Sequence, residues 1–215
     1  MSTYCTFAAG HPVHGHYHDT EHGFPSRDEA VLFERLCLEI MQAGLSWDIV
    51  LKRRATMRAA FAGFDVDSVA AFEPVDVTRL LGDPGIIRNR LKVEAIIANA
   101  RTVRGMRGTH GGFAAWLDAH HPLEKAEWVR LFRRTFRFTG GEIVGEFLMS
   151  LGWLPGAHAD DCPIQKRILA AQPRWQLGRH PQHRLFDRLS WRYASALHRE
   201  ASDGRRPRHH RTGRA

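Results

Sequence analysis

Apolar residues recur along most of the chain at the spacing of an α-helix, three or four positions apart. A clear case is the stripe Leu32, Leu36 and Ala43, with Phe33 and Ile40 beside it. No stretch alternates apolar and polar residues over the length of a β-strand, and no internal repeat is evident. The pattern therefore predicts an all-α protein without a significant sheet.

Capping residues and helix breakers divide this pattern into separate helices. Ser26 and Glu29 are spaced as a capping box in which Ser26 is the N-cap. Ser46 and Asp65 are expected to cap later helices, and Pro74 to begin another. Two helices around a tight turn are predicted within LLGDPGIIRNRLK. Further helices are predicted at about 112–120, 126–136 and 141–152, and within PIQKRILAAQPRW.

The charge of the chain is distributed unevenly. The whole chain has 31 basic and 23 acidic residues, a net charge of +8 at pH 7. Residues 174–215 contain eleven Arg and three acidic residues, which accounts for the whole excess. We predict one folded domain over residues 1–173 and a basic, partly disordered tail over residues 174–215, with a marginal helix near Leu185. A nucleic-acid interface on the body must then come from local clustering of charge.

The sequence also bears on the compartment. It has no apolar run of about 18 residues, so no membrane span is expected. Its N-terminus lacks the basic and apolar regions of a signal peptide. Three Cys without an export signal favour the reducing cytoplasm, where metal binding is more common than disulfide formation.

Two Cys and two His have a spacing typical of metal ligands: Cys5 and His18 near the start, and His158 and Cys162 four residues apart downstream. Two thiolates and two imidazoles form a closed tetrahedral set for a structural Zn²⁺, without an open position for a reacting water. This argues against a zinc hydrolase. Spacing alone leaves an equally good alternative, in which the thiols are buried and the His lie on the surface. Cys37, in an apolar run, is expected in the core.

Glu39 interrupts the apolar stripe of its predicted helix, where burial of a carboxylate is costly. One interpretation is a structural acid paired with an Arg. The other is an acid in a binding pocket, favoured by the aromatic residues Tyr17, beside His18, and Trp47, which opens the next helix. Aromatic faces near a carboxylate would suit a flat, electron-poor ring.

The turn within LGDPGIIRNRLK has Arg88, Arg90 and Lys92 close by. Free backbone N–H groups at the start of the second helix, together with these cations, would suit DNA phosphates. An ordinary helical corner with a solvated basic face is the more common explanation for such a pattern.

Four segments taken together resemble one known family. YHDTEHGFP, LEIMQAGLSWDIVLKRR, GIIRNRLKVEAIIANA and FRFTGGEIVGEFLMSLG occur in the order found in the DNA-3-methyladenine glycosylase I family, over about residues 4–162. The resemblance implies a helix-hairpin-helix DNA glycosylase fold. It also implies excision of N3-methyladenine from double-stranded alkylated DNA, which leaves an abasic site, by a protein that we expect to be monomeric.

The resemblance also suggests roles for individual residues. The two Cys and two His match the family's zinc ligands. Glu39 is the catalytic and recognition residue, Tyr17, Trp47 and Phe7 bind the substrate, and Gln42, Leu45, Arg88, Arg90 and Lys92 contact DNA, with Leu45 filling the gap left by the flipped base. The implied mechanism holds the base between Tyr17 and Trp47.

Three positions depart from the family pattern. Phe7 replaces an expected Trp, His22 stands where Trp or Tyr is usual, and Met149 replaces an amide. These changes leave two alternatives open: a shifted lesion preference, or a DNA-binding protein without catalytic activity. The presence of Glu39 and of both pocket aromatics argues against the second.

Overall fold

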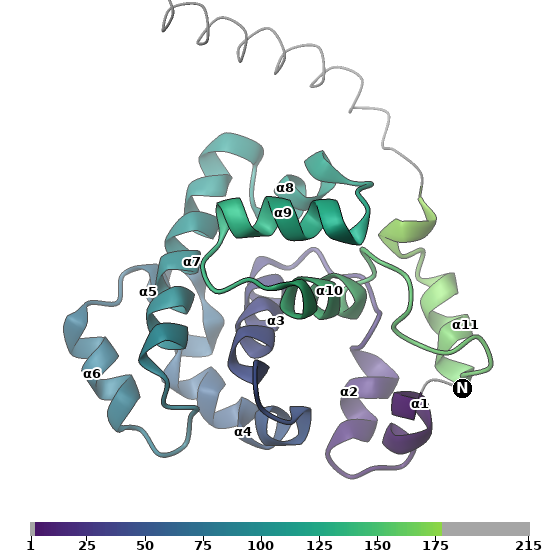
Figure 1. The fold of residues 1–215 in the computed structure, drawn as a ribbon, viewed down its shortest axis with the longest axis horizontal. Helices are drawn as coiled ribbons and strands as arrows, with labels where there is room; N and C mark the ends of the chain where they lie inside the picture. The colour runs from purple at the N-terminus through teal and green to yellow at the C-terminus, as the bar shows by residue number, and fades with distance from the viewer. Residues whose placement is uncertain (1–2, 178–215) are drawn as a thin grey trace, which may run out of the picture. The chain divides into compact units, whose positions relative to one another are not determined.

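The computed structural model describes residues 3–177, and within them every regular element is a helix (Figure 1). The α-helices are α1 (Thr3–Ala8), α2 (His14–Thr20), α3 (Glu29–Gln42), α4 (Trp47–Ala60), α5 (Val66–Ala70), α6 (Pro74–Gly82), α7 (Arg90–His110), α8 (Phe113–His120), α9 (Lys125–Thr135), α10 (Gly141–Ser150) and α11 (Pro163–Ala170), with short 3-10 turns η1 (Ala62–Phe64) and η2 (Arg174–Gln176). The all-α prediction is confirmed for this part of the chain. The helix predicted near Leu185 lies outside it. None of the described helices is both long and apolar enough to cross a membrane.

Helix α3 lies at the centre of the core. It contacts α4, α5, α7, α8 and α10 (Figure 1). Its apolar stripe, including Leu32, Phe33 and Leu36, is fully buried, and so is most of the rest of the helix. Burial on so many sides also encloses the polar side chains Arg35 and Glu39. Each of these therefore needs a partner or a shifted pKa.

The start of α3 differs from the predicted capping box. Asp28 is the N-cap, and its side chain accepts a hydrogen bond from the backbone N–H of Val31 at 3.0 Å. Ser26 Oγ instead accepts from the N–H of Asp28 at 3.3 Å. The prediction of Ser26 as N-cap was wrong because Asp28 directly precedes the first helical residue and offers a carboxylate. Ser46 is confirmed as a cap.

The turn between α6 and α7 is fixed from two sides. Asp83 Oδ1 accepts a hydrogen bond from the N–H of Gly85 at 2.7 Å. From α4, Thr56 donates to the carbonyl of Gly85 at 2.6 Å and Arg53 donates to the carbonyl of Ile86 at 2.8 Å. The predicted helix–turn–helix is therefore present, and its turn is held against α4. We call residues 83–89 the hairpin turn.

Helices α1 and α2 were not predicted. They have six and seven residues, too few for a periodic signal. A partly buried ion-pair network secures the end of α2, because Glu21 accepts from Arg35 at 2.8 Å and from Arg54 at 2.7 Å. These bonds attach the N-terminal segment to α3 and α4.

Residues just beyond position 173 still pack on the helical body. Arg174 pairs with Asp118 at 2.8 Å, and the N–H of Trp175 donates to the carbonyl of Gly152 at 3.2 Å. Residues 174 and 175, just beyond the predicted boundary at 173, thus contact the helical body.

Candidate functional site

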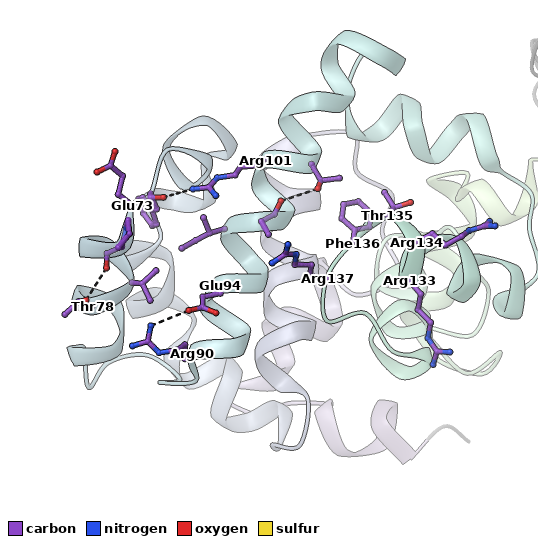
Figure 2. A pocket seen from close by; sticks show the side chains of 16 residues that line it. Glu73, Thr78, Arg90, Glu94, Arg101, Arg133, Arg134, Thr135, Phe136 and Arg137 are labelled. Carbon is purple, nitrogen blue, oxygen red and sulfur yellow. Dashed lines mark hydrogen bonds and ion pairs between the residues drawn. The ribbon is translucent and has the colours of Figure 1, made fainter. Parts of the chain in front are cut away.

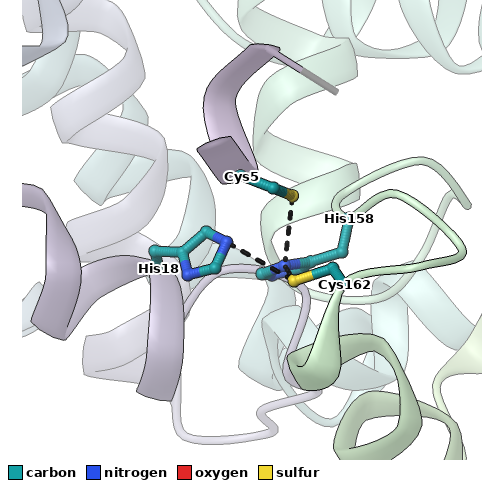
Figure 3. A group of neighbouring side chains, drawn as sticks. All are labelled: Cys5, His18, His158 and Cys162. Carbon is teal, nitrogen blue, oxygen red and sulfur yellow. Dashed lines mark hydrogen bonds between the residues drawn. The ribbon is translucent and has the colours of Figure 1, made fainter. Parts of the chain in front are cut away.

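Four side chains from distant parts of the sequence converge on one point (Figure 3). Cys5 comes from α1, His18 from α2, and His158 and Cys162 from the segment between α10 and α11. Their ligand atoms all lie within 4.8 Å of one another. His158 Nδ1 is 3.4 Å from Cys162 Sγ and 3.7 Å from Cys5 Sγ. Ligands of a tetrahedral Zn²⁺ are separated by about 3.3–3.8 Å, so this group has the dimensions of a metal site.

Both imidazole rings are oriented toward that point by partners behind them. His18 donates from Nδ1 to Asp19 Oδ1 at 2.6 Å, which leaves Nε2 facing Cys162 at 3.8 Å. His158 donates from Nε2 to the carbonyl of His22 at 2.9 Å, which leaves Nδ1 facing the two sulfurs. Such second partners fix the tautomer of metal-binding His. The donor set and its support therefore fit a metal ion, and the alternative with two surface His does not hold, since His18 and His158 are buried.

A cavity of about 760 Å³ lies beside this group. Its wall combines aromatic rings, three carboxyl groups and a glycine-rich rim. The lining includes Tyr4, Tyr17, His22, Glu39, Gln42, Trp47, Gly140, Glu146 and Met149. Segments α1, α2, α3, α4 and α10 all contribute. The sequence-predicted residues Glu39, Tyr17 and Trp47 are thus brought together in one pocket, which we call the aromatic pocket.

The carboxyl group of Glu39 is the most perturbed acid of this pocket. Its side chain is 5% exposed. The pKa of Glu39 is raised to about 8, mainly by burial and also by the nearby Glu146, while Arg35 opposes the shift. Glu39 is therefore largely protonated at neutral pH when no cation is near. A cation in the pocket would favour the carboxylate.

Tyr17 is held in the pocket wall by two partners. Its ring lies over the guanidinium of Arg35, 4.6 Å from the ring centroid, and its hydroxyl is 3.4 Å from His22 Nδ1. Burial raises the pKa of Tyr17 to about 12, and Arg35 opposes the shift. The hydroxyl therefore stays protonated at neutral pH and offers a hydrogen-bond donor.

The two predicted stacking rings do not form parallel walls. The centroids of Tyr17 and Trp47 are 5.2 Å apart, and the rings meet edge to face at 62°. Two rings in such contact leave no room for a third between them. A flat ligand in this arrangement would stack on one face and meet the other ring at its edge.

Phe7 does not line the aromatic pocket, although the family resemblance implied that it does. It lies on α1 with 54% of its side chain exposed, and its ring packs against those of His11 and His14. Tyr4, almost one turn earlier on α1, lines the pocket in its place. Helical geometry explains the correction, since residues three apart on one helix point in different directions by about 60°.

Lys92 is not available to contact DNA phosphates. It is 4% exposed, and its ammonium donates to the carbonyls of Met41 at 2.8 Å and Ala43 at 2.6 Å. Carbonyl groups at the end of a helix lack partners within that helix. Lys92 therefore supports the end of α3 and the α3–α4 turn instead of binding an external anion.

The other residues predicted to contact DNA lie on the surface. Leu45 is 37% exposed in the α3–α4 turn, and Gln42 donates to its carbonyl at 2.8 Å. Arg88 and Arg90 are exposed at the hairpin turn. Arg90 forms an ion pair with Glu94 at 3.3 Å. Both turns are thus exposed, and the α3–α4 turn borders the aromatic pocket.

Sequence reasoning missed several lining residues, among them Tyr4 and Glu146. Burial raises the pKa of Glu146, with Glu142 adding to the rise and Lys125 opposing it. The signal was available in part, because Glu146 lies three residues before Met149 on the same predicted helix. Tyr4 adjoins Cys5, so a metal at Cys5 would also fix the place of Tyr4.

Comparisons with known proteins agree on one family. The model of the methyladenine glycosylase family matches residues 7–130. DNA-3-methyladenine glycosylase 1 of Escherichia coli is 37% identical over 177 residues, which cover 74% of this chain and 94% of the relative. DNA-3-methyladenine glycosylase of Haemophilus influenzae is 34% identical over 184 residues, 77% of this chain and 99% of the relative. A crystal structure of a Tyr-to-Phe variant of 3-methyladenine DNA glycosylase I in complex with 3-methyladenine shows a TM-score of 0.68 at 29% identity, covering 75% of this chain and 96% of that one.

Proposed function

Since the chain belongs to the methyladenine glycosylase family, we propose that it removes N3-methyladenine from alkylated double-stranded DNA. The reaction hydrolyses the N-glycosidic bond and leaves an abasic site. The observation that supports this proposal most is the aromatic pocket, where the buried carboxyl of Glu39 lies among Tyr17, Trp47 and Tyr4. We further propose that the protein acts as a monomer in the cytoplasm.

The charge of the lesion suits the surroundings of Glu39. Methylation at N3 makes adenine cationic, whereas an ordinary base is neutral. A cation beside Glu39 stabilises the carboxylate, so the pKa of Glu39 falls when the methylated base binds. A neutral base offers no such compensation for the cost of a buried carboxylate. Glu39 therefore discriminates by charge.

The leaving group needs little help from an acid. The methylated base departs as a neutral molecule because it already carries a positive charge in DNA. The lesion also unstacks more readily than an ordinary base, which lowers the cost of flipping. The protein then needs to hold the flipped base against Tyr17 or Trp47, while the carboxylate of Glu39 stabilises the positive charge of the base. We assign Glu39 to recognition and to charge stabilisation, not to activation of the attacking water.

We propose that Cys5, His18, His158 and Cys162 hold one structural Zn²⁺. The spacing of the four ligand atoms and the partners of both imidazoles support this assignment. Four protein ligands leave no position for a reacting water, so the metal would act by holding the chain together. It would join α1 and α2 to the segment before α11 and so fix Tyr4 and Tyr17 in the pocket wall.

DNA would reach the pocket through the two exposed turns. We propose that Leu45 fills the space of the flipped base while Gln42 holds the α3–α4 turn in shape. Arg88 and Arg90 at the hairpin turn would contact backbone phosphates. This division separates the residues that open the duplex from those that position it.

A direct test is to incubate the purified protein with methylated duplex DNA and to identify the products. We expect free 3-methyladenine and an equal amount of abasic sites, with no release of unmodified adenine. Release of no base by a folded, zinc-containing protein would contradict the proposal. Release of a different methylated base would indicate that His22 and Met149, which both line the pocket, have shifted the lesion preference.

A further inference from the structure

A second cavity, of about 850 Å³, lies between α6, α7 and the end of α9 (Figure 2). It shares no lining residue with the aromatic pocket. Five arginines and two glutamates give it a net positive wall: Arg90, Arg101, Arg133, Arg134, Arg137, Glu73 and Glu94. We call it the arginine groove.

The arginines of this groove fall into two kinds. Arg101 donates to the carbonyls of Ala70 and Phe72, and Arg90 pairs with Glu94, so both have partners within the protein. For Arg133, Arg134 and Arg137, no carboxylate of residues 3–177 lies within ion-pair distance, and Figure 2 shows Arg133 and Arg134 extending away from the labelled acids. All three residues line the groove, and their side chains point in different directions in Figure 2. They therefore give this edge of the groove an excess of positive charge, which attracts a polyanion.

The position of Arg137 is set by the core. Asn99 of α7 is 1% exposed and forms two hydrogen bonds with the backbone of Arg137. Asn99 Nδ2 donates to the carbonyl of Arg137 at 3.0 Å, and the N–H of Arg137 donates to Asn99 Oδ1 at 2.7 Å. A buried amide thus clamps the backbone at the point where the chain leaves α9. The guanidinium of Arg137 therefore extends from a fixed point of the backbone.

The groove connects the two surfaces that the proposed function uses. Arg90 lines the groove and directly follows the hairpin turn. Arg137 lines the groove, and Gly140, three residues later, lines the aromatic pocket. The groove therefore continues from the hairpin turn toward the rim of the pocket.

We infer that the arginine groove binds the phosphodiester backbone of the DNA that flanks the lesion, beyond the phosphates held at the hairpin turn. This inference rests on the proposed function. The size of the groove agrees with it, because Arg90 and Arg101 are eleven residues apart on α7. That separation is about 16 Å along a helix, close to about five base-pair steps of one strand.

Arg133 and Arg134 also have a simpler explanation, since cations in the last turn stabilise a helix through its dipole. That explanation does not extend to Arg137, which lies beyond the end of α9. The two explanations differ in what they predict for DNA binding, because only phosphate contacts release counterions from DNA.

The test compares two triple variants of the full chain. The first carries Arg133→Gln, Arg134→Gln and Arg137→Gln. The control carries Arg27→Gln, Arg104→Gln and Lys166→Gln, which removes the same charge from exposed residues that line neither cavity. Affinity for a duplex with long flanks is measured over a range of salt concentrations. Each lost phosphate contact lowers the slope of log K against log salt by about 0.9, so we expect the first variant to lose about 2 to 3 units and the control to keep the wild-type slope.

Two further readouts separate the groove from catalysis. Single-turnover release of 3-methyladenine at saturating DNA should be unchanged in the groove variant, because the aromatic pocket is intact. Lengthening the flanks of a short duplex should increase the affinity of the wild type but not of the variant. An unchanged slope would overturn the inference, and so would an equal loss in the control.

Binding of inorganic phosphate that is lost in the variant while the DNA slope is kept would assign the groove to a small anion. If the wild type releases no base, the proposed function fails, yet the salt slopes still decide the role of the groove.

Discussion

At the level of single residues, Glu39 is distinguished by what surrounds its carboxyl group. Burial is the largest contribution to its raised pKa, and Glu146 of α10 adds to it. The sequence located Glu39 because a carboxylate interrupts an apolar stripe. It did not reveal Glu146, because the register of α10 against α3 depends on tertiary packing. The effect of Glu146 on the pKa of Glu39 therefore depends on the fold.

This balance predicts the pH dependence of the reaction. The methylated base keeps its charge at all pH values, and in the proposed mechanism it binds best beside the carboxylate form of Glu39. Below a pH of about 8, binding must first remove the proton of Glu39, so kcat/KM should rise with pH and level off near the pKa of about 8. Glu146→Gln removes one cause of the raised pKa of Glu39, so the rise of kcat/KM, the acidic limb of the pH profile, should move to lower pH.

Glu142→Gln provides the matched control for the pH profile. Glu142 also lines the pocket, but its side chain is 89% exposed and it is not among the groups that shift the pKa of Glu39. We expect this variant to keep the wild-type limb. A limb that stays in place in Glu146→Gln would show that Glu146 does not act on Glu39.

At the level of helices, the boundaries read from the sequence depend on local chemistry and were mostly correct. Ser46 and Asp65 cap the helices that they were predicted to cap. Contacts between helices could not be predicted from the sequence in the same way. Lys92 looks like one more cation near a basic turn, and only the packing of α7 against α3 shows that it binds the carbonyls of Met41 and Ala43. Helices α1 and α2 were missed because they are short and held mainly by other elements.

The role of Lys92 can be tested against its predicted phosphate contact. Lys92→Met leaves two carbonyl groups near the end of α3 without their donor. The free energy of unfolding should fall by about 1–3 kcal/mol, measured by chemical denaturation. The salt slope of DNA binding should not change, because Lys92 does not reach DNA. A slope lower by about one unit with unchanged stability would restore Lys92 as a phosphate contact.

At the level of the whole molecule, the four Cys and His residues join parts of the chain that are far apart in sequence. Positions 18 and 158 are separated by 140 residues, and their side chains lie together. The sequence suggested this convergence through the identity and local spacing of the ligands. The orientation of the rings by Asp19 and by the carbonyl of His22 emerged only from the fold.

Removal of the metal should loosen the N-terminal segment first. We expect about one Zn²⁺ per chain, and its chelation should lower the thermal midpoint and weaken binding of the base, because Tyr4 and Tyr17 lose their support. Metal content and thermal unfolding measure both effects. Cys162→Ser should reproduce them without a chelator, whereas Cys37→Ser, at a buried thiol outside the metal group, should leave the metal content unchanged. Full metal content in Cys162→Ser would contradict the assigned ligand set.

The measurement that tests the central claim most directly is release of 3-methyladenine from methylated duplex DNA by the wild type and by Glu39→Ala. The account predicts release by the wild type and a loss of about ten- to a hundredfold in kcat/KM for the variant, as expected for a charged interaction of about 1.5–3 kcal/mol. Folding of the variant is not expected to suffer at alkaline pH. The pKa of Glu39 is about 4.3 in the unfolded state and about 8 in the folded state. As pH rises between these values, ionisation of Glu39 favours the unfolded state and the wild type loses stability. The alanine variant has no carboxyl group and lacks this loss. Equal release by a folded Glu39→Ala protein would contradict the role of Glu39 in recognising the cationic base.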